Sequence, residues 1–152
     1  MANYLIGGLV AIILISFVML AIGKFQAQKF VTVKIGNATV NAELADTEAK
    51  QIRGLMFRDS LAKDGGMLFD FKRDGRHGIW MMNMSMPIDI VWLDGDKRVV
   101  SVEENAPPCG ALLICKSYSP ESNDRYVLEV AAGYAKKHGI RKGTKASFDI
   151  GG

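Results

Sequence analysis

The chain has 152 residues and a net charge of +3, from 19 Lys and Arg against 16 Asp and Glu. The charges are spread thinly, and no block of basic residues with interleaved aromatic residues occurs. This pattern excludes the strongly basic class of nucleic-acid-binding proteins, so we expect no nucleic-acid partner. The hydrophobic fraction of 49% is raised by one apolar segment near the N-terminus.

That segment, Tyr4 to Ile22, contains no charged residue, and the first charged side chain is Lys24. As a helix of 19 residues it would be about 28 Å long, close to the roughly 30 Å hydrocarbon core of a bilayer. A cleavable signal peptide has a basic start and a shorter apolar stretch. We therefore predict a single membrane anchor over residues 1–28, with removal at the small residues Ala21-Ile22-Gly23 as the open alternative.

The remaining residues, 29–152, are long enough for one domain with its own core. β-Branched residues and a turn-forming Gly-Asn pair predict a hairpin. Its strand, turn and second strand are Lys29–Ile35, Gly36-Asn37 and Ala38–Leu44. A helix is then expected after a cap at Asp46 or Thr47, running to about Met56. The side chains expected to lie on a sheet from this helix are Ala49, Ile52, Leu55 and Met56.

Further short apolar runs separated by turn residues predict six more strands and a second helix. The strands are Met67–Phe71, Gly78–Met84, Ile88–Leu93, Arg98–Glu103, Tyr126–Val130 and Lys145–Ile150, and the helix is Gly133–His138. A polar loop over Lys72–Gly78 and a long loop over Asn105–Asp124 complete the pattern. Together these elements predict a single α+β, mostly β domain, a partly closed barrel or a sandwich with one or two packed helices.

The long loop carries both cysteines of the chain, Cys109 and Cys115. Their spacing fits neither a CxxC redox motif nor a four-ligand zinc site. A disulfide closing this loop would remove about 2.4 kcal/mol of unfolded-chain entropy. In an oxidising compartment we expect the disulfide, and in cytosol two thiols.

The side of the membrane is not decided by these residues. Lysines at positions 24, 29 and 34 follow the apolar segment, which favours a cytoplasmic domain. The cysteine pair and two glycosylation sequons, at Asn37 and Asn83, favour the outer side.

Six of the eight methionines lie between Met56 and Met86. On a strand, Met82, Met84 and Met86 would share one face, and thioethers are soft ligands that suit Cu(I). The alternative is that these methionines fill irregular space in the core.

Two acids interrupt apolar strands: Asp89 in IDIVWL and Glu129 in VLEV. Buried acids need partners, because an isolated buried charge is costly, and a structural ion pair competes with a polar binding or catalytic site. The two tryptophans, Trp80 and Trp92, are expected to seal the core. No GxSxG, HExxH or phosphate-binding glycine loop occurs, so no catalytic motif identifies an enzyme.

Five segments in order resemble the family called domain of unknown function 192. They are GLMFR (54–58), GGMLFDF (65–71), IWMMNMSMPIDIVWLD (79–94), the Pro108-Cys109…Cys115…Tyr118 loop and LEVAAGYAKKHGI (128–140). The resemblance implies a small, mostly β domain with one packed helix, often exported or anchored, and it tips the predicted topology outward. Its recurrent polar residues fall on Arg58, Asn83, Asp89 and Glu129, beside Trp80 and Met81, whereas the chain departs from the family pattern at Met82 and Met84.

The resulting hypothesis is a membrane-anchored, extracytoplasmic domain that binds a small ligand or a partner protein without catalysis or a cofactor. The expected ligand-binding residues are Arg58, Trp80, Asn83, Asp89 and Glu129, with the cysteine loop as the rim. The alternatives are a hydrolase that uses Asp89 or Glu129 as general base, and Cu(I) binding by the methionine face.

Overall fold

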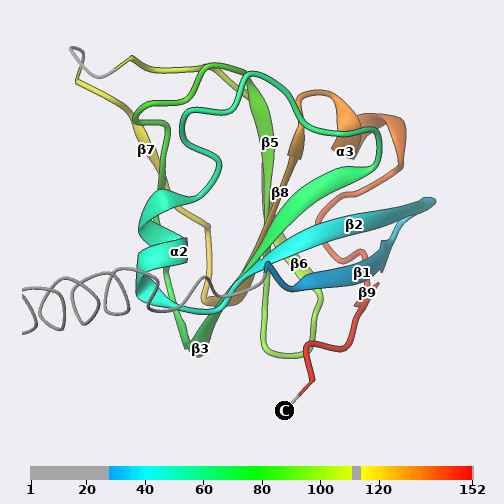
Figure 1. Ribbon diagram of the computed structural model, residues 1–152. Helices are drawn as coiled ribbons and strands as arrows, with labels where there is room; N and C mark the ends of the chain where they lie inside the picture. Colours follow the sequence, from blue (N-terminus) through cyan, green and yellow to red (C-terminus); the bar gives the residue numbers. More distant parts are fainter. Residues whose placement is uncertain (1–27, 111–113, 152) are drawn as a thin grey trace, which may run out of the picture.

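The computed structural model describes residues 28–110 and 114–151. These residues form a mostly β domain of the α+β class with two short helices (Figure 1). The strands are β1 (Phe30–Ile35), β2 (Ala38–Ala45), β3 (Gly65–Gly75), β4 (Ile79–Trp80), β5 (Ile88–Leu93), β6 (Val99–Ala106), β7 (Ser117–Tyr118), β8 (Asp124–Ala131) and β9 (Ala146–Ser147). The helices are α2 (Glu48–Arg53) and α3 (Tyr134–Lys137).

The predicted membrane anchor is almost entirely outside this part of the chain. Residues 1–27 are not described, so the structure does not test the anchor. Across the two described ranges, no helix has both the length and the apolar character needed to cross a bilayer.

Seven strands form one sheet in the order β6-β5-β8-β3-β2-β1-β9. Neighbouring strands are antiparallel except β2 and β3, which are parallel. The two edges of the sheet approach each other, since Val99 N donates to Thr144 O at 2.9 Å and Ala146 N donates to Lys97 O at 2.9 Å. The sheet is thus a half-barrel, the first of the two predicted architectures, and not a sandwich.

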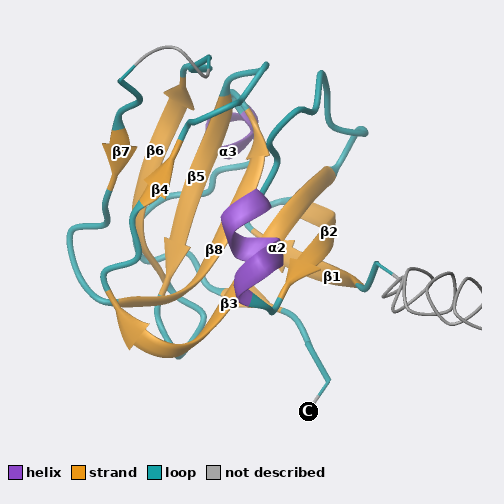
Figure 2. Ribbon diagram, turned by 60° about the vertical axis from the view of Figure 1, so that its left-hand side comes forward, coloured by secondary structure: helices purple, strands orange, loops and turns teal. Residues whose placement is uncertain are grey.

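Alternating side chains of the curved sheet form two apolar clusters, one on each face. The inner cluster fills the half-barrel with residues of β1, β2 and α3, including Val33 and Tyr134. The outer cluster includes Phe69, Trp92 and Met84 and lies under β4 and β7. Figure 2 shows α2 in front of the sheet and α3 behind it. The central strands are therefore buried on both faces.

Helix α2 is shorter than predicted and packs differently. It ends at Arg53 because Gly54 has φ +48, outside the helical region. None of its residues is buried, and Ile52, which was expected to face the sheet, is 56% exposed. Of the four side chains predicted to face the sheet, Leu55 is buried just beyond the helix end, whereas Ala49 and Ile52 within the helix are exposed, so the predicted face is wrong for the helix itself.

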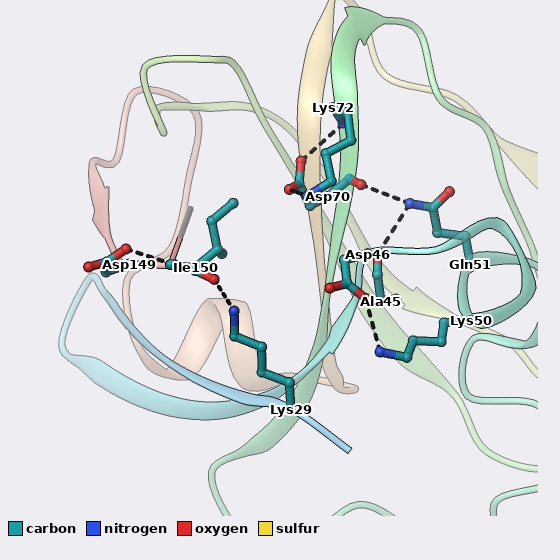
Figure 3. A network of polar contacts seen from close by, with 10 residues as sticks. Lys29, Ala45, Asp46, Lys50, Gln51, Asp70, Lys72, Asp149 and Ile150 are labelled. Atoms are coloured by element: carbon teal, nitrogen blue, oxygen red, sulfur yellow. Dashed lines mark hydrogen bonds and ion pairs between the residues drawn. The ribbon is translucent and has the colours of Figure 1, made fainter. Parts of the chain in front are cut away.

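Polar contacts attach α2 to the sheet instead (Figure 3). Gln51 Nε2 donates to Ala45 O at 3.2 Å and to Asp70 O at 2.8 Å, which bridges β2 and β3. At the start of the helix, Lys50 Nζ contacts Asp46 Oδ1 at 2.9 Å. These polar contacts leave Ile52 exposed at the surface.

Two loop predictions also change. Strand β3 continues through the predicted polar loop as far as Gly75. The long loop Asn105–Asp124 contains the short strand β7, which pairs with β4: Ile79 is opposite Tyr118 and Trp80 is opposite Ser117. The sequence could not reveal this pairing, because β4 and β7 have only two residues each.

Candidate functional site

A cleft of about 390 Å³ lies between α2, the outer face of β3, and the β4–β7 pair. Most of its lining is apolar. The apolar residues of the lining are Ile52, Leu55, Met56, Phe69, Phe71, Ile79, Trp80 and Met84. Ile52 and Trp80 are 56% and 45% exposed, so the mouth of the cleft presents apolar surface to solvent. Such a concave apolar surface with few polar groups is typical of a small-ligand site.

Ring stacking fixes Phe71, one of the aromatic residues that line the cleft. Phe71 stacks on the His77 ring with centroids 3.9 Å apart and 2° between the planes. His77 Nδ1 lies 2.9 Å from Asp124 Oδ2, and Trp92 Nε1 donates to His77 O at 2.8 Å. These contacts hold the ring of Phe71, which lines the cleft, against His77.

Glu129 is a buried acid in the lining. It lies in β8, is only 4% exposed, and its Oε2 has no hydrogen-bond partner among the described residues. Burial raises the pKa of Glu129 to about 8, although the positive charge of Arg58 acts in the opposite direction. At neutral pH the side chain of Glu129 is therefore mostly a neutral carboxylic acid.

Arg58 does not pair directly with Glu129 but with Glu43. Its two terminal guanidinium nitrogens donate to the two carboxylate oxygens of Glu43, and the bond to Oε2 is 2.6 Å. Strand register places Glu43 opposite Met67, and Met67 opposite Glu129. The two acids therefore share one face, about 10 Å apart across two strand spacings. Hydrogen bonding to Glu43 raises the pKa of Arg58, so its charge is permanent.

The structure separates Asp89 from the other predicted site residues. Its carboxylate accepts backbone hydrogen bonds from Asn105 N at 2.8 Å, Gly133 N at 3.0 Å and Ala135 N at 2.8 Å. Side chains alternate along β5, so Asp89 points to the same face as Val91 of the inner cluster. The next residue, Ile90, points to the opposite face and belongs to the outer cluster. Asp89 therefore does not line this cleft, and its carboxylate serves three backbone donors in place of the side-chain partner that was expected.

Trp80 and Asn83 lie near the cleft in different ways. Trp80 lines it directly, so the expectation that this ring seals the core is wrong, whereas Trp92 is buried. Asn83 does not line the cleft but contacts one of its lining residues. Its carbonyl oxygen accepts from Phe57 N at 2.9 Å, and its Nδ2 lies 3.8 Å from Sδ of the lining residue Met56.

The three alternating methionines do not form a strand face. Only Ile79 and Trp80 of the predicted strand are extended in a ladder, and Asn83 has φ +56, which breaks the alternation. Met84 and Met86 are buried in the outer cluster. The structural premise of the copper hypothesis is therefore absent, because the segment turns where the argument required a strand.

The cysteine loop borders the cleft. Cys109 and Cys115 form a disulfide with 5.7 Å between their Cα atoms. Cys115 and Ser117 both line the cleft, and Ser117 Oγ donates to Ile79 O at 3.4 Å. The disulfide thus closes the loop beside the cleft mouth.

A second hollow, of about 340 Å³, is polar. Its lining residues are Asp74, Asp94, Gly95, Asp96 and Arg125. Asp74 already accepts from Arg125 Nε at 2.7 Å. Within residues 28–110 and 114–151, no group of three or more His, Cys, Asp or Glu is arranged to hold a metal ion.

Sequence reasoning missed several residues of the apolar cleft. Phe69 and Phe71 alternate with Met67 in GGMLFDF, and this period of two could have placed all three on one face. Glu43 carried no comparable pattern, because its importance comes from pairing with Arg58.

Comparisons with known proteins agree on family and fold. The sequence profile of the family described as DUF192, uncharacterized ACR, matches residues 31–148. A UPF0127 protein of Thermococcus gammatolerans is 30% identical over 112 residues, which cover 72% of this chain and 67% of the relative.

Two crystal structures resemble the domain. A protein from Sinorhizobium meliloti 1021, described as a proposed transcription regulator, is 28% identical with a TM-score of 0.74, covering 82% of this chain and 98% of that one. A protein of unknown function from Novosphingobium aromaticivorans DSM 12444 is 30% identical with a TM-score of 0.73, covering 81% and 88%.

Proposed function

This chain belongs to the DUF192 family, and because the description of that family names no activity, we propose a function from the cleft itself. The domain binds a small, largely apolar ligand, or an apolar side chain of a partner protein, between α2 and β3 without transforming it. The observation that carries this proposal is the cleft of about 390 Å³, open at Ile52 and Trp80 and floored by aromatic rings.

The cellular setting is part of the same proposal. The uncharged segment Tyr4 to Ile22 supports attachment to a membrane, and the Cys109–Cys115 disulfide supports an oxidising compartment. We place the domain at the outer surface of the membrane, with the cleft accessible to extracytoplasmic ligands.

A hydrolase is the second candidate. Of its two proposed bases, only Glu129 lines the cleft, and its raised pKa is a feature of many catalytic acids. The cleft-lining hydroxyl of Ser117 is donated to Ile79 O, away from a general base. Turnover of p-nitrophenyl acetate above background, lost in Glu129→Gln, would favour the enzyme.

We do not extend transcriptional regulation to this chain. A helix that reads the major groove needs several turns, and the helices of the described residues have six and four residues. The mild net charge of +3 also supplies little attraction for phosphate.

Binding can be tested with p-cresol, a water-soluble ring small enough for the cleft. The full chain in lipid nanodiscs is titrated by saturation-transfer NMR, with empty nanodiscs as background. Trp80→Ala and Ile52→Asp should each raise the Kd at least about fivefold, because each alters the apolar mouth.

Phe30→Ala is the matched control, since Phe30 is 54% exposed but does not line the cleft. Equal binding of p-cresol by wild type and both mouth variants would refute the proposal, as would signal no greater than that of empty nanodiscs.

A further inference from the structure

We propose that the ligand of this cleft carries a primary ammonium group on an apolar stem and that the carboxylate of Glu129 receives the ammonium. This inference rests on the proposed binding function and specifies the chemistry of the ligand. The stem would lie among the aromatic rings of the cleft, and the charged end would reach the floor.

The first support is the unsatisfied oxygen of Glu129. Oε2 has no hydrogen-bond partner in the described part of the chain, although the side chain is 96% buried (4% exposed) and lines the cleft. In Asp89, the comparable acid of the neighbouring strand, both oxygens accept backbone hydrogen bonds, three in total. Buried polar atoms are normally paired, so an unpaired one in a ligand-sized cleft indicates a group that arrives from outside.

The second support is the path to this oxygen. Gly54 borders the cleft, and a Cβ added there would lie 3.9 Å from Glu129 Oε2 and 3.4 Å from Cζ of Phe69. A larger side chain at this position would project toward the carboxyl group. The glycine, which the helix end already requires at φ +48, therefore places no side chain between the cleft and the carboxyl group.

The third support is the balance of charge. Arg58 is committed to Glu43 through both terminal nitrogens, so ionised Glu129 has no cation of its own. The other two charged residues of the lining, Glu48 and Arg53, have opposite formal charges that sum to zero. When Glu129 is ionised, its negative charge is therefore not balanced by a positive charge in the cleft. An ammonium group would supply that charge, and an anionic ligand would not. Trp80 at the mouth adds a ring face that attracts cations.

Binding would be coupled to proton release. The empty cleft holds Glu129 mainly as the neutral acid at pH 7, because burial raises its pKa. An alkylammonium then displaces that proton: the carboxylic acid and the cation give a carboxylate–ammonium pair and one proton in solution. The other charged groups near the acid are Arg58, Glu43, Glu48 and Arg53. The hydrogen bond from Arg58 to Glu43 raises the pKa of Arg58, so Arg58 stays charged while Glu129 titrates.

The test compares n-butylammonium, n-butanol and butyrate on the full chain in nanodiscs, by NMR titration and by calorimetry in two buffers of different ionisation enthalpy. We expect n-butylammonium to bind at least about tenfold more tightly than n-butanol, with butyrate weakest. Close to one proton should be released per ligand at pH 7. Glu129→Gln should reduce the preference to within about twofold and abolish proton release, whereas Glu121→Gln, at an exposed residue that pairs with Lys142 and does not line the cleft, should preserve both.

Equal binding of n-butylammonium and n-butanol, or a preference that survives Glu129→Gln, would overturn the inference. If p-cresol still binds in that case, the proposed function stands and only the ligand chemistry fails. If p-cresol does not bind either, both fail. The ammonium group could come from a lysine side chain of a partner protein or from a small amine, and a capped lysine, Nα-acetyl-lysine methylamide, distinguishes the two. If the capped lysine binds as tightly as n-butylammonium, the result supports a protein side chain. If only n-butylammonium binds, it supports a small molecule.

Discussion

Asp89 and Glu129 lie on adjacent strands but point to opposite faces of the sheet. Asp89 is paired with Val130, and Glu129 is paired with Ile90, so the two acids are offset by one residue in register. Because side chains alternate along a strand, that single step assigns one acid to the interior of the half-barrel and the other to the cleft. The two acids therefore have separate roles.

Asp89 should contribute to stability without affecting the cleft. Asp89→Ala leaves three buried backbone donors, those of Asn105, Gly133 and Ala135, without their acceptor. We expect a loss of roughly 4 kcal/mol in the free energy of unfolding, measured by urea titration, with p-cresol binding unchanged in the folded protein. A loss below about 1 kcal/mol, or selective loss of p-cresol binding, would contradict this assignment.

Glu129 should make stability fall as pH rises. Its folded pKa of about 8 lies above the ordinary value of 4.5, so the folded protein retains a proton that the unfolded chain releases between these values. The contribution is fully present below pH 4.5 and is lost as the pH rises through about 8. Relative to Glu129→Gln, the wild type should lose roughly 3 kcal/mol of unfolding free energy between pH 5 and pH 8. Parallel pH profiles of the two proteins would argue against a buried neutral acid, and Glu48→Gln, at an exposed position, should follow the wild type.

Arg58 should hold the pKa of Glu129 lower than burial alone would set it, because its positive charge favours the carboxylate. We expect Arg58→Gln to raise the pKa of Glu129, observed by ¹³C NMR titration of the Glu129 carboxyl carbon. Arg125→Gln is the matched control, because Arg125 pairs with Asp74 instead. An unchanged or lowered pKa in Arg58→Gln would show that the two groups are not coupled.

The disulfide should stabilise the rim of the cleft more than the half-barrel. Replacing Cys109 and Cys115 together by serine should remove about 2.4 kcal/mol, the entropy of closing so short a loop. Amide hydrogen exchange should accelerate most at Trp80 and Ser117, which are opposite each other in the two-residue strands β4 and β7. Exchange at Val33 in the main sheet serves as the internal reference, and a uniform acceleration there and at the rim would contradict a local effect.

Local sequence was sufficient for the regular parts of the fold. The hairpin around Gly36 is formed as predicted, with Ile35 opposite Ala38, and β5 has the predicted bounds Ile88–Leu93. These elements follow from nearby residues: a turn that needs positive φ, and runs of β-branched and apolar side chains. Helix α2 was predicted at the right place for the same reason, since Thr47 caps it and Gly54 ends it.

The candidate site was harder to predict because it depends on contacts between distant segments. Trp80 and Glu129 were named from the sequence and both line the cleft, while Arg58 lies beside it, paired with Glu43. Asp89 could not be distinguished from Glu129, because both acids sit in strands buried on both faces. Such strands lack the alternation of polar and apolar residues that would reveal which face a side chain occupies.

The order of residues alone was enough to identify a mostly β domain, its strand-forming segments, its family and a short list of polar residues in apolar surroundings. Which of those residues share a surface became clear only from the folded arrangement of the strands. A strand's two faces are equivalent until its neighbours are paired in register and one face is covered. Pairing of β8 with β3 and β5 turned Glu129 toward the cleft and left Asp89 to the backbone donors around α3.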